Sequence, residues 1–178
     1  METTVFETAL GEFGIGWTDA GVARLQLPGM DSADLRMHIN RGGATPGEPP
    51  PVIEAVINHI EDYAEGDVVE FRGVPLDLEG VPEFHRRAYG LLIEYGWGQT
   101  TTYGALARAL GDVTLSRAVG QAMGANPIPL IIPCHRVLAS GDKAGGFSAP
   151  GGAVSKLKML ALEGVAVGAP AGQMTFGF

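Results

Sequence analysis

The first thirty residues alternate between apolar and polar or glycine positions, a pattern with the two-residue period of β-strands. Candidate strands cover residues 4–10, 13–17 and 22–27, separated by Gly11 and by an Asp-Ala-Gly turn. We therefore expect a small antiparallel meander. Asp31 or Ser32 can cap a short helix that continues to about Asn40.

The next forty residues predict a loop, a helix and one more strand. Residues 41–51 are rich in glycine and proline, which disfavour helix and sheet pairing, so an exposed loop is expected. Apolar residues then recur every three or four positions from Val52 to Tyr63, as on an amphipathic helix that ends near Gly66. Residues 68–71 are predicted to form an extra strand, and residues 74–83 to cross to a second domain.

From Pro82 onward the apolar spacing is helical. A first helix carries a stripe that includes Phe84, Ala88 and Leu92 and is expected to end at Gly96-Trp97-Gly98. Two short helices, over about 102–110 and 115–123, are joined by a glycine-containing turn, which is the layout of a helix-turn-helix. Helix pairs of this length also occur without DNA binding.

A glycine-rich stretch and a last helix complete the chain. Residues 139–152 could form a loop whose backbone groups bond an extruded base, or only a flexible linker. The helix is expected over residues 153–163. Its predicted inward residues are Val154, Leu157, Leu160 and Ala161, and its predicted outward residues are Lys156 and Lys158.

These elements predict an α/β (α+β) fold of two domains. Residues 1–81 would form a small N-terminal domain with an antiparallel sheet and helices. Residues 82–178 would form a mostly helical, winged-helix-like domain that contains the helix-turn-helix; its tail, residues 165–178, receives no assignment.

Composition excludes several classes of protein. Of 178 residues, 46% are apolar, which suffices for a hydrophobic core. The sequence shows neither a membrane helix nor the basic start of a signal peptide. We therefore expect no membrane partner and a cytoplasmic location, with nucleoid association in a bacterium. The single cysteine excludes an internal disulfide and a cysteine-rich zinc site. The four histidines are scattered, so no metal is expected.

The net charge of −8 argues at first against a nucleic-acid partner, but the charge is unevenly distributed. Residues 1–83 hold sixteen acidic and four basic side chains, a local net charge of −12, whereas residues 85–158 hold three acidic and eight basic ones, a net charge of +5. Fields fall off within about 8–10 Å at physiological salt, so the basic half could contact phosphates while the acidic half faces away. An ordinary mixed surface would have the same composition.

The strongest chemical signal is Ile132-Pro133-Cys134-His135-Arg136-Val137, which holds the only cysteine. A thiol attacks as the thiolate, so it needs a base or positive charge nearby and access to substrate. His135 and Arg136 could supply the base and the charge. The alternative is that Cys134 is a small buried hydrophobe.

Three other polar residues stand in informative places. Arg117 is the one long cation on a helix of small residues, which could approach a narrow groove closely while Arg117 reaches into the base stack; a surface salt bridge is the alternative. Glu163 falls on the last turn of a helix, where the dipole disfavours an anion, so it should have a partner unless it is simply solvated. Asn126, before a proline, can bond backbone groups across a turn.

The order and spacing of four motifs resemble those of the O6-alkylguanine-DNA alkyltransferases, also called methylated-DNA–protein-cysteine methyltransferases. The motifs are Tyr103-Gly104, Ser116-Arg117-Ala118-Val119-Gly120, the hexapeptide around Cys134, and Gly146-Phe147-Ser148. The resemblance covers residues 82–164. It implies direct-reversal DNA repair by a monomer that needs no cofactor or metal. The protein would bind double-stranded DNA by the minor groove and flip out an O6-alkylguanine, with O4-alkylthymine left open as a second substrate. It would then transfer the alkyl group irreversibly, once per molecule. The N-terminal domain is implied to buttress the catalytic half.

The resemblance also implies a role for each matching position. Cys134 would accept the alkyl group, His135 would draw its proton through a water, Glu163 would orient His135, and Tyr103 would protonate the departing guanine. Arg117 would fill the gap left by the flipped nucleotide. The other implied contacts are Thr102, Ser116, Ala118, Gly120 and Gly124 to DNA, and Tyr103, Val137, Phe147, Ser148 and Ala149 to the substrate, with Asn126 and Arg136 as structural residues.

Two departures from the family pattern affect the predicted pocket. Phe147 stands where members often have tyrosine, and the chain is two residues longer between Ser148 and Glu163, so the preferred alkyl group is left open.

Three other functions are also open. A non-catalytic lesion binder would not need Cys134. A cysteine hydrolase would bring its histidine from elsewhere in the chain rather than from the adjacent position. A helix-turn-helix transcription factor would have a more polar recognition helix.

Overall fold

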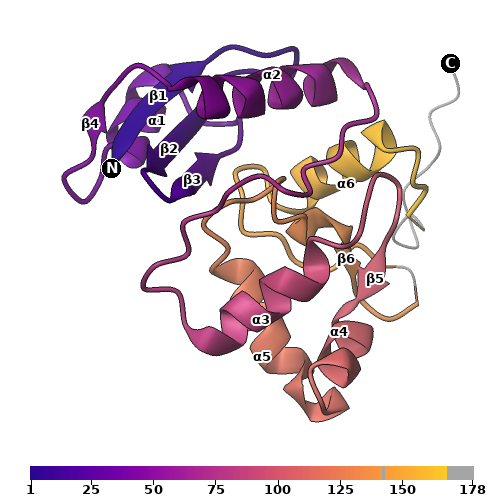
Figure 1. Cartoon of the computed structure of the whole chain (residues 1–178). Coiled ribbons are helices and arrows are strands. Elements are labelled where there is room, and N and C mark those ends of the chain that lie inside the picture. Colours follow the sequence, from indigo (N-terminus) through magenta and orange to yellow (C-terminus); the bar gives the residue numbers. More distant parts are fainter. Residues whose placement is uncertain (142, 168–178) are drawn as a thin grey trace, which may run out of the picture.

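A four-stranded sheet forms the N-terminal part of the protein (Figure 1). In this computed structural model, which describes residues 1–141 and 143–167, the predicted meander consists of β1 (Glu2–Phe6), β2 (Phe13–Thr18) and β3 (Gly21–Gln26). Strand β2 pairs antiparallel with both neighbours. A short strand β4 (Thr45–Pro46) adds parallel to β1, so the strand order is β3-β2-β1-β4.

Two predictions about the N-terminal part are wrong in detail. The expected loop over residues 41–51 contains β4; this is possible because an edge strand tolerates Pro46, which cannot donate to a ladder. The expected strand over residues 68–71 is absent. In that segment Val69 and Phe71 are buried, so its alternating apolar residues anchor an unpaired stretch of chain to the core.

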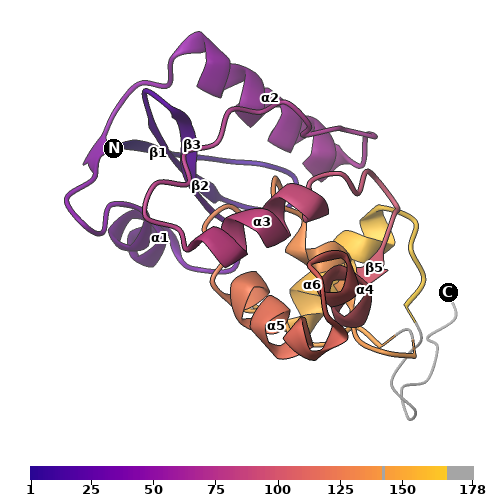
Figure 2. The ribbon, with the colours of Figure 1, turned by 60° about the horizontal axis from the view of Figure 1, so that its bottom comes forward.

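Helices cover both faces of the sheet (Figure 2). Helix α1 (Ser32–Ile39) approaches the face on which β2 carries glycine: a Cβ added to Gly14 would lie 3.2 Å from side-chain atoms of Leu35 and Ile39. Helix α2 (Pro51–Glu65) covers the opposite face, toward which the large residues Phe13, Ile15 and Trp17 of β2 alternate. The alternation of glycine with large apolar residues therefore lets one strand be buried on both sides.

The C-terminal part is mostly helical. It contains α3 (Glu83–Leu92), α4 (Tyr103–Ala109), the 3-10 turn η1 (Val113–Leu115), α5 (Ser116–Gly124), the 3-10 turn η2 (Cys134–Arg136) and α6 (Ala153–Leu162). Helices α4 and α5 pack together as the predicted helix-turn-helix. Strand β5 (Thr101–Thr102) pairs parallel with β6 (Val137–Leu138). Because β5 leads directly into Tyr103 and β6 follows η2 directly, this pairing brings Tyr103 close to Cys134.

One hydrophobic core runs through both parts of the molecule, with Ile15 and Ile60 from the first and Leu92, Val119 and Ile132 from the second. The backbone N–H of β3 residue 25 also donates to the carbonyl of residue 127, at 2.9 Å. The N-terminal part is thus fixed against the segment that leads to Cys134, while the division at residue 81 stays a prediction. Among the helices in the described ranges, none is long and apolar enough to cross a bilayer; residues 168–178 of the predicted tail lie outside those ranges.

Candidate active site

The backbone before Cys134 is held by hydrogen bonds and by an unusual turn. Asn126 donates its amide to the carbonyl of Ile132 at 2.8 Å and accepts from the N–H of Ile128 at 3.0 Å. Leu130 has φ of 77° and is the one non-glycine residue with positive φ in the part of the chain that the structure describes. This conformation costs about 1–2 kcal/mol, which the burial of Leu130 and the bonds of Asn126 offset. The sulfur of Cys134 is therefore held in one place.

A cavity of about 370 Å³ opens beside Cys134, and its size is typical of small-molecule sites. Its walls come from α4, α5, η2 and the glycine-rich loop: Tyr103, Gly120, Met123, Gly124, Cys134, Gly146, Phe147 and Ser148. Gly120 and Gly124 have no side chain, so this wall of the cavity is the backbone of α5. Six of the predicted site residues thus share one cavity, and Met123 joins them without having been predicted.

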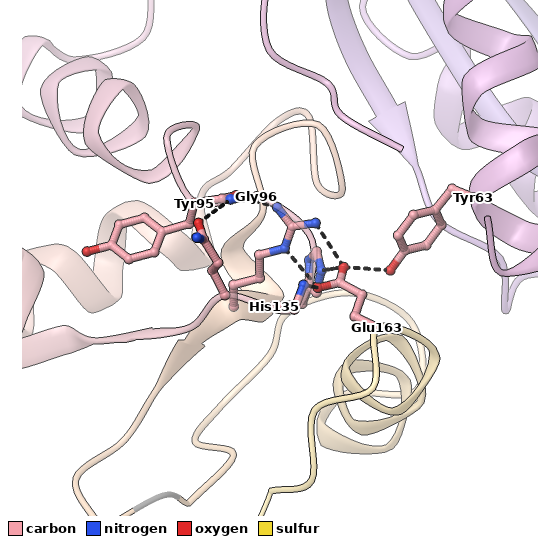
Figure 3. Close-up of polar contacts among 8 residues, drawn as sticks. Tyr63, Tyr95, Gly96, His135 and Glu163 are labelled. Atoms are coloured by element: carbon pink, nitrogen blue, oxygen red, sulfur yellow. Dashed lines mark hydrogen bonds and ion pairs between the residues drawn. The ribbon is translucent and has the colours of Figure 1, made fainter. Parts of the chain in front are cut away.

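Glu163 is the common acceptor of a buried hydrogen-bond network that includes His135 and Tyr63 (Figure 3). It caps the C-terminus of α6, and its side chain is fully buried, so the alternative of a solvated carboxylate is wrong. Its Oε1 lies 2.7 Å from Nε2 of His135, and Arg136 donates to its two oxygens at 2.9 and 3.0 Å. Tyr63 of α2 donates its hydroxyl at 3.0 Å and the Gly98 N–H donates at 3.3 Å. Five donors compensate the anion that the helix dipole disfavours.

The pKa values of this network set the tautomer of His135. Burial alone would raise the pKa of Glu163, but the hydrogen bonds from His135 and Arg136, the charge of Arg136 and that of His135 when its ring is protonated outweigh it and lower the pKa to about 2. Glu163 is therefore ionised and accepts the proton of Nε2. Burial lowers the pKa of His135, against the opposing effect of Glu163, so the ring is neutral at pH 7 and carries a lone pair on Nδ1. That buried Nδ1 has no hydrogen-bond partner among the described residues, which makes it the atom able to take a proton.

The thiol of Cys134 is protonated at rest. Its residue is 4% exposed, and burial raises its pKa, while the amide of Asn126 and the charge of Lys156 act in the opposite direction. A thiol with a raised pKa is a weak nucleophile, so chemistry here requires a base.

The predicted orientation of α6 is wrong at Lys156 and Val154. We expected Lys156 to face outward with Val154 facing inward, but Lys156 is fully buried and Val154 is 60% exposed. Its ammonium donates to the carbonyls of Val137 at 2.5 Å and Gly146 at 3.4 Å. Burial lowers the pKa of Lys156 to about 8, so it remains mostly charged at pH 7. A lysine in a helical pattern indicates a surface position, and only the packing of β6 and the glycine-rich loop against α6 supplies the carbonyls that compensate its burial.

Tyr103 begins α4 on the cavity wall. Its hydroxyl donates to the carbonyl of Gly146 at 3.4 Å, and Nζ of Lys156 lies 5.8 Å from the centre of its ring. Burial raises the pKa of Tyr103, and the thiolate form of Cys134 raises it further, so Tyr103 keeps its proton at neutral pH. Tyr103 is therefore a proton donor next to the sulfur.

The remaining predicted residues lie around the cavity or along α5. Arg117 is exposed, and no carboxylate of the described residues lies within the 4.0 Å limit for an ion pair, so the salt-bridge alternative lacks support. Thr102 caps α4 by accepting from Ala105 at 3.1 Å, and Ser116 donates to the carbonyl of Val113 at 2.6 Å. Ala118 is half-buried on α5, Ala149 lines a neighbouring groove, and Val137 is buried with its carbonyl bonded to Lys156.

Three residues of the site were missed: Tyr63, Met123 and Lys156. Tyr63 fell on the apolar face of a predicted helix, and the one available signal was that a buried tyrosine hydroxyl normally has a partner. Nothing local identified that partner, because Glu163 is one hundred positions away in the chain.

Comparisons with known proteins agree on one family. A family model described as "6-O-methylguanine DNA methyltransferase, DNA binding domain" matches residues 83–165. The methylated-DNA–protein-cysteine methyltransferase of Mycolicibacterium paratuberculosis is 36% identical over 152 residues, covering 82% of this chain and 88% of the relative. That of Methanothermobacter thermautotrophicus is 32% identical over 156 residues, covering 88% and 81%. The structure of Mycobacterium tuberculosis OGT in complex with DNA is similar with a TM-score of 0.76, at 29% identity over 92% of both chains.

Proposed function

This chain belongs to the methylated-DNA–protein-cysteine methyltransferases, and from that premise we propose how its own residues perform the reaction. It repairs DNA by direct reversal, moving an alkyl group from the damaged base to a protein cysteine. We propose that Cys134 is that cysteine. The observation that carries the proposal is that the only thiol of the chain lines the cavity next to a buried histidine–carboxylate pair.

Proton transfer comes first in the proposed mechanism. Nδ1 of neutral His135 takes the proton of the Cys134 thiol through a water, and the resulting imidazolium is stabilised by Glu163, which already accepts from Nε2. The ion pair with Arg136 keeps Glu163 ionised and in place throughout. Arg136 is thus a positioning residue.

Alkyl transfer follows as a displacement at carbon. The sulfur lone pair forms the S–C bond, the bond from carbon to O6 of guanine breaks, and its electrons remain on the base. Tyr103 gives its hydroxyl proton to the departing guanine, and the positive charge of Lys156 near its ring favours the tyrosinate that forms. The product is a thioether, which has no carbonyl for water to attack, so each molecule acts once without cofactor or metal.

We propose that the base reaches Cys134 by flipping out of the duplex. A guanine within a stacked duplex cannot enter the cavity, and extrusion costs a few kcal/mol, less for a badly paired lesion. The glycine wall of α5 permits close approach to the minor groove, with Thr102, Ser116 and Ala118 along the contact. The exposed and unpaired Arg117 would then fill the gap in the stack.

The edges of the flipped guanine would be tested by backbone groups at the cavity. The carbonyl of Val137 has two lone pairs, of which Lys156 uses one, so it can still accept from the base. The N–H of Ser148 and the neighbouring Ala149 complete this contact. Phe147 offers no hydroxyl to the lesion oxygen, which favours apolar contact with the alkyl group.

The rest of the chain supports this site. We propose that residues 1–81 are a domain that buttresses the catalytic half, residues 82–178, through the bond from Tyr63 to Glu163 and the shared core. A monomer suffices, because one chain supplies every group in the mechanism. A reactive thiol stays reduced in the cytoplasm, or at the nucleoid of a bacterium, and this is the location we propose.

Mass spectrometry tests the assignment of Cys134. A duplex with one O6-methylguanine, incubated with excess protein, should add one methyl group to each reacted chain, on the peptide that contains Cys134, and a second addition of duplex should give no further product. Cys134→Ser should be inert. A hydrolase would turn over repeatedly and a lesion binder would gain no mass; either result would refute the proposal.

A further inference from the structure

A second groove, of about 480 Å³, opens next to the cavity and leads to the N-terminal part of the protein. It shares Gly124, Cys134, Phe147 and Ser148 with the cavity, so the two spaces are continuous around the sulfur. Its far side is formed by β3 and by the C-terminal end of α1 with the residues that follow. The residues on this far side take no part in the proposed alkyl transfer.

The charged residues along the groove are all basic. Arg24, His38 and Arg41 line it, and within residues 1–141 and 143–167 no aspartate or glutamate does. Among the described residues, no carboxylate lies within the 4.0 Å limit for an ion pair with any of the three. This clustering is unexpected in a half of the chain with sixteen acidic and four basic side chains.

The three side chains are held close together although the guanidiniums of Arg24 and Arg41 repel each other. Nη1 of Arg24 donates to the carbonyls of Ile39 at 2.7 Å and Arg41 at 3.1 Å, and Nη1 of Arg41 lies 3.5 Å from Nδ1 of His38. Burial lowers the pKa of Arg24 and of His38, and the charge of Arg41 lowers both further. Uncompensated repulsion of this kind is relieved by an anion.

The side chain of Arg24 is also preorganised to bind an anion. A guanidinium has five N–H donors, and the carbonyls of Ile39 and Arg41 occupy the two on Nη1. The donors on Nε and Nη2 have no partner in the described part of the chain, and together they form the edge that binds a phosphate in a bidentate manner. The two carbonyl bonds fix the direction of that edge, so little side-chain entropy is lost on binding.

We propose that this groove binds a backbone phosphate of the damaged strand next to the flipped nucleotide, held by Arg24 and Arg41 with His38. The inference rests on the proposed function. A flipped nucleotide stays covalently joined to its flanking phosphates, so a base inside the cavity brings them to the cavity mouth, where the groove begins. The N-terminal half, otherwise acidic enough to repel DNA, would thus contact the strand directly.

Single-turnover kinetics at several salt concentrations test this contact. With a duplex carrying O6-methylguanine, Arg41→Gln should raise the half-saturating protein concentration about three- to tenfold and leave the limiting rate unchanged. The salt dependence should weaken by about one unit of log K against log salt, as expected for one lost phosphate contact. With the free base O6-methylguanine, which has no phosphate, the rates of variant and wild type should be equal.

Arg72→Gln is the matched control. Arg72 lies in the same acidic half and loses the same charge, but it lies near Glu70 and Glu94, at 3.9 and 3.7 Å, and does not line the groove. It should leave the salt dependence unchanged. Arg24→Gln should act like Arg41→Gln, with its thermal midpoint measured alongside because its carbonyl bonds are also lost.

The outcomes separate the two proposals. Phosphate binding in the groove would be overturned by any of three results. Arg41→Gln could have no effect, it could have the same effect as Arg72→Gln, or it could slow transfer from the free base as much as transfer from the duplex. Wild-type protein that transfers no alkyl group from either substrate would instead overturn the proposed function.

Discussion

Replacing Glu163 by glutamine is the most informative perturbation of the buried network. The amide has nearly the same shape as the carboxylate, but it is neutral and turns one acceptor into a donor. Two donors, Arg136 Nε and the Gly98 N–H, point at one oxygen, and three, from His135, Arg136 and Tyr63, point at the other. Either orientation of the amide therefore sets N–H groups against each other and leaves Arg136 as a buried cation without its partner.

The loss of stability can be estimated in two ways. Breaking a buried ion pair by removing one partner costs about 3–5 kcal/mol. The depression of the Glu163 pKa from its ordinary 4.5 to about 2 independently corresponds to roughly 3 kcal/mol at neutral pH. For a chain of this size, in which 1 kcal/mol shifts the thermal midpoint by about 2–4 °C, the midpoint should fall by about 6–20 °C.

Acidification should reduce the difference in stability between the wild type and Glu163→Gln. A carboxyl whose pKa is lowered by folding stabilises the protein above its unfolded pKa, and that contribution is lost as the pH falls toward about 2. The gap between wild type and Glu163→Gln should therefore narrow between about pH 5 and pH 2. Circular dichroism during heating at several pH values measures it.

The same variant should lose activity for a separate reason. A glutamine amide can donate to Nε2 of His135, which would move the ring proton to Nδ1 and remove the lone pair that takes the proton of Cys134. We expect alkyl transfer, measured in a single turnover well below the thermal midpoint, to slow by about 10²-fold or more.

Glu94→Gln is the matched control, because Glu94 pairs with Arg72 at 3.7 Å on the surface, where both side chains are at least half exposed. It should change stability by less than about 1 kcal/mol and leave transfer unchanged. If Glu163→Gln proved as stable as Glu94→Gln, or transferred the alkyl group at the wild-type rate, our interpretation of the network would be wrong.

Three other substitutions test separate parts of the site. Lys156→Met should raise the thiol pKa of Cys134, seen as a shift to higher pH in its reaction with iodoacetamide, and slow transfer; an unshifted pH profile would contradict this role. Its free energy of unfolding should fall by about 1–3 kcal/mol, because the carbonyls of Val137 and Gly146 lose their donor. Tyr63→Phe should lower stability by about 1.5–3 kcal/mol, the worth of a hydrogen bond to a charged group, and a thermal midpoint equal to that of wild type would count against it. Arg117→Ala should leave the free energy of unfolding within about 0.5 kcal/mol of the wild-type value, because Arg117 is exposed. It should slow alkyl transfer from a duplex but not from the free base; equal slowing with both substrates would contradict a role of Arg117 in DNA contact.

Much of the site could be predicted because its chemistry is local in the chain. Cys134, His135 and Arg136 are consecutive, so one hexapeptide contains the nucleophile, the base and a charge. The period of the apolar residues similarly predicted the meander, the amphipathic helix α2 and the two helices around Arg117. The position of Glu163 on the last turn of a helix, where the dipole disfavours an anion, also favoured a partner for it, with a solvated carboxylate as the alternative.

Tertiary structure decided which distant groups complete the site. Residues 68–71 have the alternation of a strand, yet no neighbouring strand is placed to pair with them, because pairing depends on the fold and not on the segment. Lys156 has the sequence pattern of a surface residue, and only the folded chain places the carbonyls of Val137 in β6 and Gly146 in the glycine-rich loop next to it. Tyr63 meets Glu163 only after the two halves of the chain have packed together. Arg24 meets Arg41 only after α1 has packed beside β3. Local periodicity determines helices, strands and the nucleophile, whereas burial and long-range hydrogen bonds, which set pKa values and charge clusters, exist only in the folded chain.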